Sequence, residues 1–381
     1  VEMGLGRGVY PGLGDLANWP DESITGDAGP VKNPANTHIV RHAGRILALW
    51  EQGLPTEIAA DLSTIGEWDF HGQLQGAMTA HPRIDPRTGE MFFFSYNLFP
   101  PYLSYYAVDA AGALVHHVDI DLPAPVMMHD MLLTEDYAVF MDSPIVFNLE
   151  GMASGEPMVG WKPENGTRLG VMPRLGTADE ISWYEVDPSH VQHFWNAWQQ
   201  GNRIELSGCR FEEVHFGIEA ESSDAESGIG EAGGVPARYW IDLDAGTAGS
   251  EFFDDLSGEF CRVNDDLTGV RTDCLYMSGF TRPDPRGGDF DTVVKYDART
   301  DTRSRWYAGD DCNIGENVFA PDPSGTAEDD GWLLTSFHDS AAGESEILVL
   351  DARDVRAGPV ARVKIPQRMP FGFHANWFPA G

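Results

Sequence analysis

The sequence predicts an all-β protein whose strands form the blades of a β-propeller. Short runs of β-branched and aromatic residues are typical of strands, and they recur as RILAL (45–49), MFFFSYN (91–97), LSYYAV (103–108), YAVFM (137–141), TVVKY (292–296) and EILVL (346–350). Turns that contain aspartate separate these runs, and Gly and Asp favour such turns. Three of the turns, at Asp244, Asp297 and Asp351, recur at intervals of 53 and 54 residues. This interval is close to the length of one four-stranded propeller blade.

Helical periodicity is scarce along the chain. The stretch HVQHFWNAWQQG (190–201) fits either a strand end or a short helix. The acidic, glycine-rich stretch at 219–234 is predicted to be a flexible loop. No change of composition divides the sequence, so we expect residues 1–381 to form a single domain. The sequence begins with valine, and its N-terminal part is expected to be incomplete.

Composition excludes several functional classes. The formal net charge is −35, and a field of this sign repels phosphate backbones, so a nucleic-acid partner is not expected. No run of 18 apolar residues and no signal peptide are visible. We therefore expect a cytoplasmic protein, with peripheral membrane contact as an additional expectation. Four cysteines without a CxxC spacing predict reduced thiols rather than a zinc site.

Four of the twelve histidines have distinctive apolar or aromatic neighbours and lie near strand ends: His81, His129, His193 and His374. In a propeller, the inner strand of every blade runs along the central axis, so residues distant in sequence can meet there. Neutral imidazole is a good ligand for iron, zinc or copper. The four histidines therefore predict a metal site on the axis, with packing in a core as the simpler alternative for each histidine.

Seven ordered segments resemble the carotenoid cleavage oxygenase family, which includes apocarotenoid, lignostilbene and isoeugenol oxygenases. The segments are NPANTHIVRHAGRILALWEQGLPTEI, AHPRIDPRTGE, MHDMLLTEDYAVF, HFWNAWQQGNRI, GEFCRVN, GENVFAPDPSGTAEDDGWLL and GFHANWFP. The resemblance implies a seven-bladed β-propeller with a cap of helices and loops over one face. It also implies non-haem Fe(II), held by His81, His129, His193 and His374, with two open coordination positions for O2 and another ligand.

The resemblance assigns further residues around the iron. Glu51, Glu259 and Glu316 match glutamates that fix the second ring nitrogens of the histidines; the alternative is three strand-end glutamates that face water. Thr37 matches a threonine whose methyl group faces an open position of the iron, or it lies in a polar turn. HFWNAW favours His193 over His190 as the ligand.

The implied reaction is O2-dependent cleavage of one carbon–carbon double bond into two carbonyl products. An apolar polyene requires an aromatic-lined tunnel, for which the candidates are Trp50, Phe194, Phe371, Phe373 and Trp377. Relatives that cleave stilbenes or isoeugenol carry a lysine where this chain has Trp50. The substrate is therefore expected to be a carotenoid or apocarotenoid.

Several alternatives remain open at this point. They are a stilbene- or phenylpropene-cleaving oxygenase and a polyene isomerase on the same scaffold, and also a zinc hydrolase or a metal-free binding propeller. The early segments of the family are not found before residue 32, which leaves the first and closing strands of the propeller in doubt. The oligomeric state is not predicted.

Overall fold

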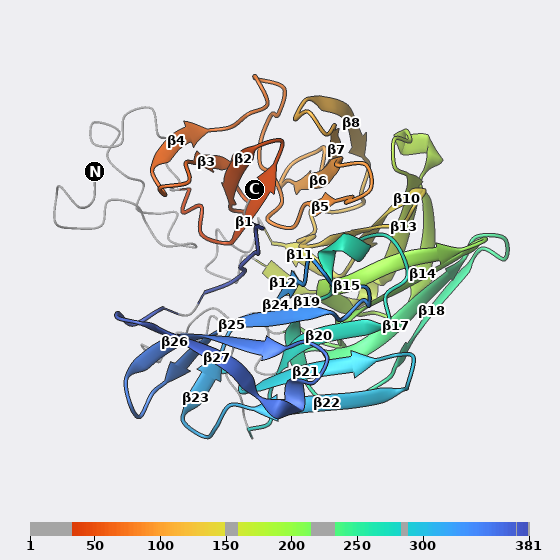
Figure 1. Ribbon diagram of the computed structural model, residues 1–381. Helices are drawn as coiled ribbons and strands as arrows, with labels where there is room; N and C mark the ends of the chain where they lie inside the picture. Colours follow the sequence, from red (N-terminus) through yellow and green to blue (C-terminus); the bar gives the residue numbers. More distant parts are fainter. Residues whose placement is uncertain (1–32, 149–158, 215–232, 283–288, 371, 380–381) are drawn as a thin grey trace.

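Six antiparallel sheets are arranged around a common centre in the computed structural model, which describes residues 33–148, 159–214, 233–282, 289–370 and 372–379 (Figure 1). Sheet 1 contains β1 (His38–His42), β2 (Arg45–Leu49), β3 (Thr56–Ile58) and β4 (Thr64–Glu67). Sheet 2 contains β5 (Arg83–Ile84), β6 (Met91–Tyr96), β7 (Leu103–Val108) and β8 (Leu114–Ile120). Sheet 3 contains β9 (Met131–Leu133), β10 (Tyr137–Asp142), β13 (Thr167–Pro173) and β14 (Ser182–Val186).

The chain continues around the ring in the same way. Sheet 4 contains β15 (His190–Gln200), β16 (Arg203–Phe211), β17 (Val235–Asp242) and β18 (Thr247–Phe252). Sheet 5 contains β19 (Gly258–Arg262), β20 (Cys274–Gly279), β21 (Thr292–Asp297) and β22 (Thr302–Tyr307). Sheet 6 contains β23 (Cys312–Ile314), β24 (Val318–Pro321), β25 (Gly331–Asp339), β26 (Glu344–Asp351) and β27 (Pro359–Ile365). A two-stranded ribbon of β11 (Ile145–Phe147) and β12 (Val159–Trp161) interrupts sheet 3 between β10 and β13.

Each of sheets 1 to 5 is a meander whose first strand lies nearest the centre, and first strands of neighbouring sheets pack on one another, as β15 does on β9 and β19. The predicted strand runs are confirmed, and 190–201 coincides with the long strand β15 rather than a helix. The three aspartate turns join the third strand of a sheet to its outer strand, and Asp351 Oδ1 accepts a hydrogen bond from Arg353 N at 2.9 Å. These observations confirm the propeller prediction.

Two details of the prediction are wrong for the described residues, which form six blades and not seven. The repeat interval sets the size of a blade but not the number of blades, and the strands between His38 and Ile365 accommodate about six such intervals. The expected helical cap is also not formed by this part of the chain, where the helical segments are 3-10 helices at Pro163–Asn165, Ala178–Glu180, Asp265–Leu267 and Val355–Ala357. The predicted loop at 219–234 lies mostly outside the described residues.

The apolar core is divided among the interfaces between neighbouring sheets. Five clusters of buried side chains join sheets 1 and 2, 2 and 3, 3 and 4, 4 and 5, and 5 and 6. Phe93, Phe140, Tyr239, Trp195 and Leu348 are fully buried examples, one from each cluster. Burial of one such side chain contributes about 1.5–3 kcal/mol. None of the five clusters of described residues joins sheet 6 to sheet 1.

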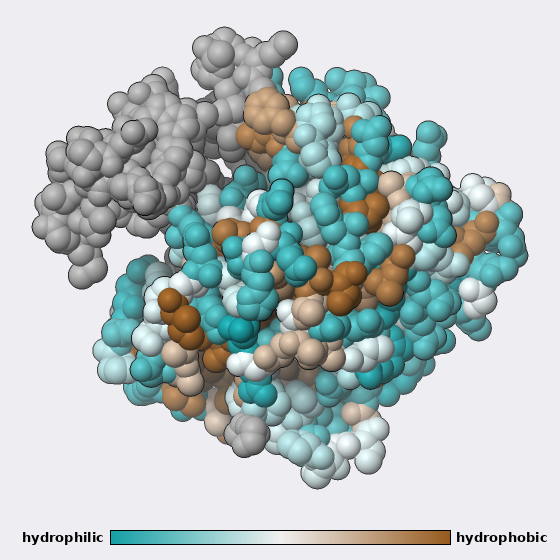
Figure 2. Space-filling model, turned by 90° about the horizontal axis from the view of Figure 1, so that it is seen from above, coloured by the Kyte–Doolittle hydropathy of each residue, from teal (hydrophilic) through white to brown (hydrophobic). Residues whose placement is uncertain are grey.

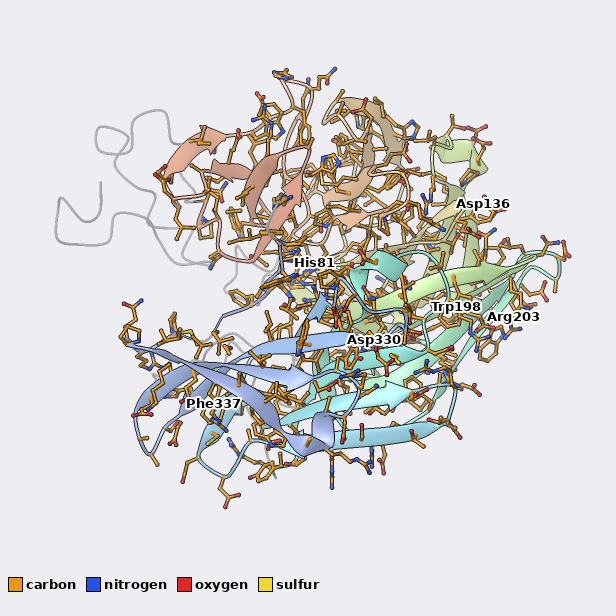
Figure 3. The ribbon with its side chains drawn as sticks, viewed as in Figure 1. His81, Asp136, Trp198, Arg203, Asp330 and Phe337 are labelled. Carbon is orange, nitrogen blue, oxygen red and sulfur yellow. The ribbon has the colours of Figure 1, made fainter. Side chains whose placement is uncertain are left out.

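The outside of the ring is polar. Figure 3 shows His81 near the centre, whereas Asp136 and Arg203 lie at the periphery. The face in Figure 2 is mostly hydrophilic, with hydrophobic residues in separate patches. Phe99, in the loop between β6 and β7, is 70% exposed. No helix among the described residues has the length and apolar character needed to cross a membrane.

Candidate metal centre

The structure brings the four predicted histidines together at the centre of the ring. His81 precedes β5, His129 precedes β9, His193 lies on β15, and His374 lies on the segment that follows β27. One ring nitrogen of each histidine lies within 4.8 Å of those of the other three. The Nε2 atom of His129 is 3.0 Å from that of His81 and 3.2 Å from that of His193. Three different sheets and the C-terminal segment thus supply one compact group of imidazoles.

Carboxylates fix three of these rings. His129 Nδ1 donates a hydrogen bond to Glu51 Oε2 at 2.8 Å, and His374 Nδ1 donates to Glu316 Oε1 at 3.0 Å. His193 Nδ1 donates to Glu259 Oε2. The three predicted glutamates therefore contact three of the four predicted histidines. They come from the turn after β2, from β19, and from the connection between β23 and β24.

The chemistry of this donor set fits a metal cation. An ionised carboxylate only accepts hydrogen bonds, so each Nδ1 atom that contacts one carries the proton and each Nε2 atom carries a lone pair. These lone pairs face one another in a buried space, where His81, His129 and His193 are each 8% exposed. Lone pairs at such short separations repel, and a cation at their common centre would convert that repulsion into ligation. Imidazole ligands whose second nitrogen is held by an acid are typical of metal sites.

The pKa values of the group also favour a metal ion over protons. Burial, followed by the neighbouring histidines, lowers the pKa of His81 well below its usual value. Burial lowers the pKa of His374 to about 4, although Glu316 acts in the opposite direction. Burial also disfavours a charge on His193, but the Glu259 carboxylate outweighs it and raises the pKa of that ring. Protonation of all four rings together is therefore strongly disfavoured.

The Glu51 and Glu316 carboxylates remain ionised. Burial works against the charge of Glu316, but Arg262 and His374 hold the pKa of its carboxyl far below the usual value. Burial likewise opposes the charge of Glu51, which His129 and a hydrogen bond from Tyr96 overcome, so its pKa is lowered. The centre therefore surrounds neutral ligand atoms with fixed negative charge.

Irregular backbone directs two of these side chains inward. The pairing of β15 with β16 shifts register between Val191 and Phe194, and a bulge of this kind changes the direction of a side chain. His193 thereby joins the centre, whereas His190 Nδ1 accepts a hydrogen bond from Ser143 Oγ at 3.0 Å. In β19 the register shifts after Glu259, and Phe260 has a φ of +55°. A non-glycine residue in this region is strained, which is common at functional sites.

The other predicted site residues lie at varied distances from the tetrad of histidines. Thr37 directly precedes β1, and its carbonyl oxygen accepts a hydrogen bond from His374 N at 3.1 Å. Phe194 is buried in the cluster between sheets 3 and 4. Trp50 is half-buried, while Phe373 and Trp377 are 56% and 44% exposed. Phe371 lies outside the described residues. Their roles at the iron or in substrate binding stay predictions.

Three residues at the centre were not predicted from the sequence. Tyr96 hydrogen-bonds to Glu51, and the ring of Phe260 lies 5.8 Å from that of His193 and 5.2 Å from that of His374. His38 lies next to Thr37, with its ring 5.9 Å from that of His81 and 5.5 Å from that of His374. Proximity in the sequence to a predicted site residue could have indicated two of them, because Phe260 adjoins Glu259 and His38 adjoins Thr37.

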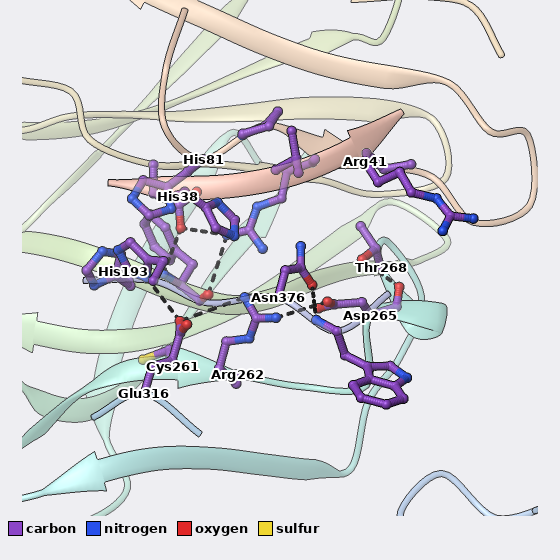
Figure 4. Close-up of a pocket in the computed structure, with 18 of the residues that line it drawn as sticks. His38, Arg41, His81, His193, Cys261, Arg262, Asp265, Thr268, Glu316 and Asn376 are labelled. Carbon is purple, nitrogen blue, oxygen red and sulfur yellow. Dashed lines mark hydrogen bonds and ion pairs between the residues drawn. The ribbon is translucent and has the colours of Figure 1, made fainter. Parts of the chain in front are cut away.

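A cavity of about 250 Å³ with a mixed polar and apolar lining adjoins the tetrad (Figure 4). His81, His193 and His374 form part of its wall. Charged residues of both signs line much of the remainder: Arg83, Asp130, Arg262, Asp265 and Glu316. Phe194 and Trp377, which were proposed to bind substrate, also line it.

Asp130 joins three sheets beside the tetrad. Its Oδ2 atom accepts hydrogen bonds from Arg83 Nη2 at 2.5 Å and from Phe194 N at 3.0 Å, and its Oδ1 atom accepts one from Met131 N at 2.7 Å. The carboxylate is 1% exposed. Asp130 therefore holds the strands that follow or carry His81, His129 and His193 at fixed separations.

The fold and this centre define a β-propeller protein with a four-histidine group on its axis. The sequence matches the family described as retinal pigment epithelial membrane protein over residues 2–379, and the chain belongs to that family. Carotenoid 9,10(9',10')-cleavage dioxygenase 1 of Arabidopsis thaliana is 34% identical over 360 residues, which cover 90% of this chain and 66% of that protein. The chain thus spans slightly less than two-thirds of the length of this relative.

Solved structures show the same similarity. The lignostilbene dioxygenase of Pseudomonas brassicacearum has a TM-score of 0.88 and 28% identity, covering 100% of this chain and 81% of that one. The cobalt-substituted apocarotenoid oxygenase of Synechocystis has a TM-score of 0.79 and 27% identity, covering 90% of this chain and 74% of that one.

Proposed function

We propose that this chain is an Fe(II)-dependent oxygenase that uses O2 to cleave a carbon–carbon double bond of a carotenoid or apocarotenoid into two carbonyl products. The observation that carries the proposal is the convergence of four imidazole nitrogens, three of them on rings oriented by buried carboxylates. The carotenoid and apocarotenoid oxygenases among the relatives support the reaction. Iron, when bound, would supply activation of O2 beside the alkene.

The residues of the chain have separable roles in this proposal. His81, His129, His193 and His374 hold the ion, and all four are neutral ligands. Glu51, Glu259 and Glu316 fix the rings of three of them and balance the positive charge of the ion. Phe260 places an apolar ring against two of the imidazoles and limits the access of water there. Thr37 is proposed to border the open side of the ion.

Trp50 favours a polyene over a phenolic substrate. An indole ring cannot supply the cation that would bind a phenolate oxygen. Lys162, Lys295 and Lys364 are the lysines in the described ranges, and none of them lines the cavity beside the tetrad. The Lys295 amine is 2.7 Å from Asp329 in an ion pair. The similarity to a lignostilbene dioxygenase keeps stilbenes as the second candidate class.

Metal analysis and product analysis test the proposal together. The full chain is loaded with Fe(II) without oxygen, and its metal content is measured. It is then given ¹⁸O2 with an apocarotenal and, separately, with a 4-hydroxystilbene. We expect about one iron per chain, two carbonyl products from the apocarotenal, and ¹⁸O in at least one of them. Cleavage of the stilbene alone would establish the second class instead.

The remaining outcomes identify other functions. A polyene that is isomerised without incorporation of oxygen would indicate an isomerase on the same scaffold. Zinc retained in preference to iron, with hydrolysis of an ester or amide, would indicate a hydrolase. A chain that binds no metal would contradict the proposed centre itself.

A further inference from the structure

A fifth histidine borders the tetrad with one nitrogen free. His38, the first residue of β1, is 7% exposed and lines the cavity beside the tetrad with His81, His193 and His374. Its Nδ1 atom lies 2.8 Å from the carbonyl oxygen of Ala80. Because a carbonyl oxygen only accepts hydrogen bonds, Nδ1 carries the proton and Nε2 carries a lone pair. That Nε2 atom is buried and has no hydrogen-bond partner among the described residues.

A buried lone pair without a hydrogen-bond donor or a metal ion raises the free energy of the folded chain. A buried acceptor that is left unsatisfied costs about 1–3 kcal/mol. The neutral imidazole is a good ligand for divalent transition metals.

The cavity wall carries buried charged groups beside apolar residues such as Ile84 and Phe194. The carboxylates of Asp130 and Glu316 are 1% and 3% exposed, and the Arg262 side chain is 12% exposed. The Nε atom of Arg262 is buried without a partner among the described residues. A water molecule of an ion's hydration shell would accept a hydrogen bond from this Nε–H group.

We propose that this cavity is the route by which the metal ion reaches the tetrad, and that His38 Nε2 binds the ion in transit. The inference rests on the metal centre under the proposed function. On arrival, a water molecule leaves the ion and the His38 lone pair takes its place; on passage, the bond between His38 and the ion breaks as an imidazole of the tetrad binds, without any change of oxidation state. The ion then passes from His38 to the adjacent His81 and His374.

A transit ligand has a kinetic signature that a final ligand lacks. A group that binds the ion only on the way stabilises the barrier, so its loss slows uptake and release by the same factor and leaves the affinity unchanged. Loss of a final ligand or of a structural contact changes the affinity. His38→Gln can keep the hydrogen bond to Ala80 through its amide group but offers no imidazole lone pair.

The test follows Co(II) entering and leaving the full metal-free chain, by visible absorption and by transfer to a chelator. We expect His38→Gln to show about tenfold slower uptake and release, equivalent to about 1.4 kcal/mol in each barrier, with one cobalt per chain at unchanged affinity. His42→Gln is the matched control, because His42 lies on the same strand and its Nε2 donates to Gly89 O at 2.8 Å. This control should exchange cobalt at the wild-type rates.

A second variant tests the route without altering a ligand. Ile84, half-buried on β5, lines the same cavity, and Ile84→Phe should narrow the passage and slow both rates equally. Wild-type rates in both His38→Gln and Ile84→Phe, or a weaker affinity at unchanged uptake rate in His38→Gln, would overturn the inference while the metal centre stands. Failure of the wild-type chain to bind cobalt would instead refute the proposed function.

Discussion

The substitution Glu316→Gln tests how strongly a buried carboxylate holds the metal centre. Glu316 Oε1 accepts the hydrogen bond of His374 Nδ1 at 3.0 Å, and Oε2 accepts that of Ala375 N at 2.8 Å. His374 lies beyond the last strand, so these two bonds and its backbone bond to Thr37 are what position it. Glutamine has one carbonyl oxygen for two donors, and its NH2 group must face one of them.

The expected loss follows from those contacts. A hydrogen bond to a charged group contributes about 1.5–3 kcal/mol, and one to a neutral group about 0.5–1.5 kcal/mol. Replacing two charged bonds by one neutral bond and one mismatch should weaken metal binding by about 2–3 kcal/mol. This corresponds to a Kd that is about 30- to 150-fold higher. Arg262, whose Nη1 is 3.8 Å from Glu316, also loses a charge partner.

Competition with a chelator of known affinity measures this Kd, and circular dichroism checks the fold. Glu346→Gln is the matched control, because Glu346 is also buried but its partner is Arg362, at 2.8 Å in sheet 6, and not a histidine. The control should retain the wild-type Kd. If folded Glu316→Gln binds metal within twofold of the wild type, the carboxylate does not support His374 in the way the geometry indicates.

Three further predictions follow. Glu51→Gln should raise the Kd for the metal about tenfold, because His129 loses a charged acceptor; unchanged metal retention and activity would count against that role. Trp50→Lys should shift the ratio of kcat/KM toward 4-hydroxystilbene over apocarotenal, since it supplies a cation for a phenolate; an unchanged ratio would show that this position does not select the substrate. Burial lowers the pKa of His190 to about 3, against the opposing hydrogen bond with Gln192. Below pH 6.5 the unfolded chain therefore binds a proton that the folded chain does not bind until about pH 3. This histidine should reduce the free energy of unfolding by about 1.4 kcal/mol per pH unit as the pH falls through that window. Denaturant titrations at several pH values should show a correspondingly shallower pH dependence for His190→Gln.

The sequence predicts the strands well because their signals are local. Residues 45–49 and 91–96 each place a run of apolar side chains within one strand, and an aspartate turn at Asp85 precedes the second run. The four histidines could be selected because flanking residues distinguish them, and the resemblance to the carotenoid cleavage oxygenase family pointed to the three glutamates. The number of blades is not a local property, so the sequence pattern does not determine it.

The residues that the sequence does not reveal act through three-dimensional placement. His38 resembles any strand histidine until Ala80 fixes its tautomer from 42 positions away. Phe260 reaches the tetrad because the backbone of β19 adopts a positive φ, which no composition pattern indicates. Asp130 adjoins a predicted ligand, but its bonds to Arg83 and Phe194 depend on two other sheets.

Among the described residues, no buried apolar cluster joins the last sheet to the first. Buried apolar side chains fill the other five boundaries between neighbouring sheets. The boundary between sheet 6 and sheet 1 is crossed by the segment that carries His374, whose backbone N–H donates a hydrogen bond to Thr37 O. An ion bound by that histidine and by three histidines from earlier blades would link the C-terminal segment to those blades. Removal of the ion would open the propeller at the boundary between sheet 6 and sheet 1 before any single blade unfolded.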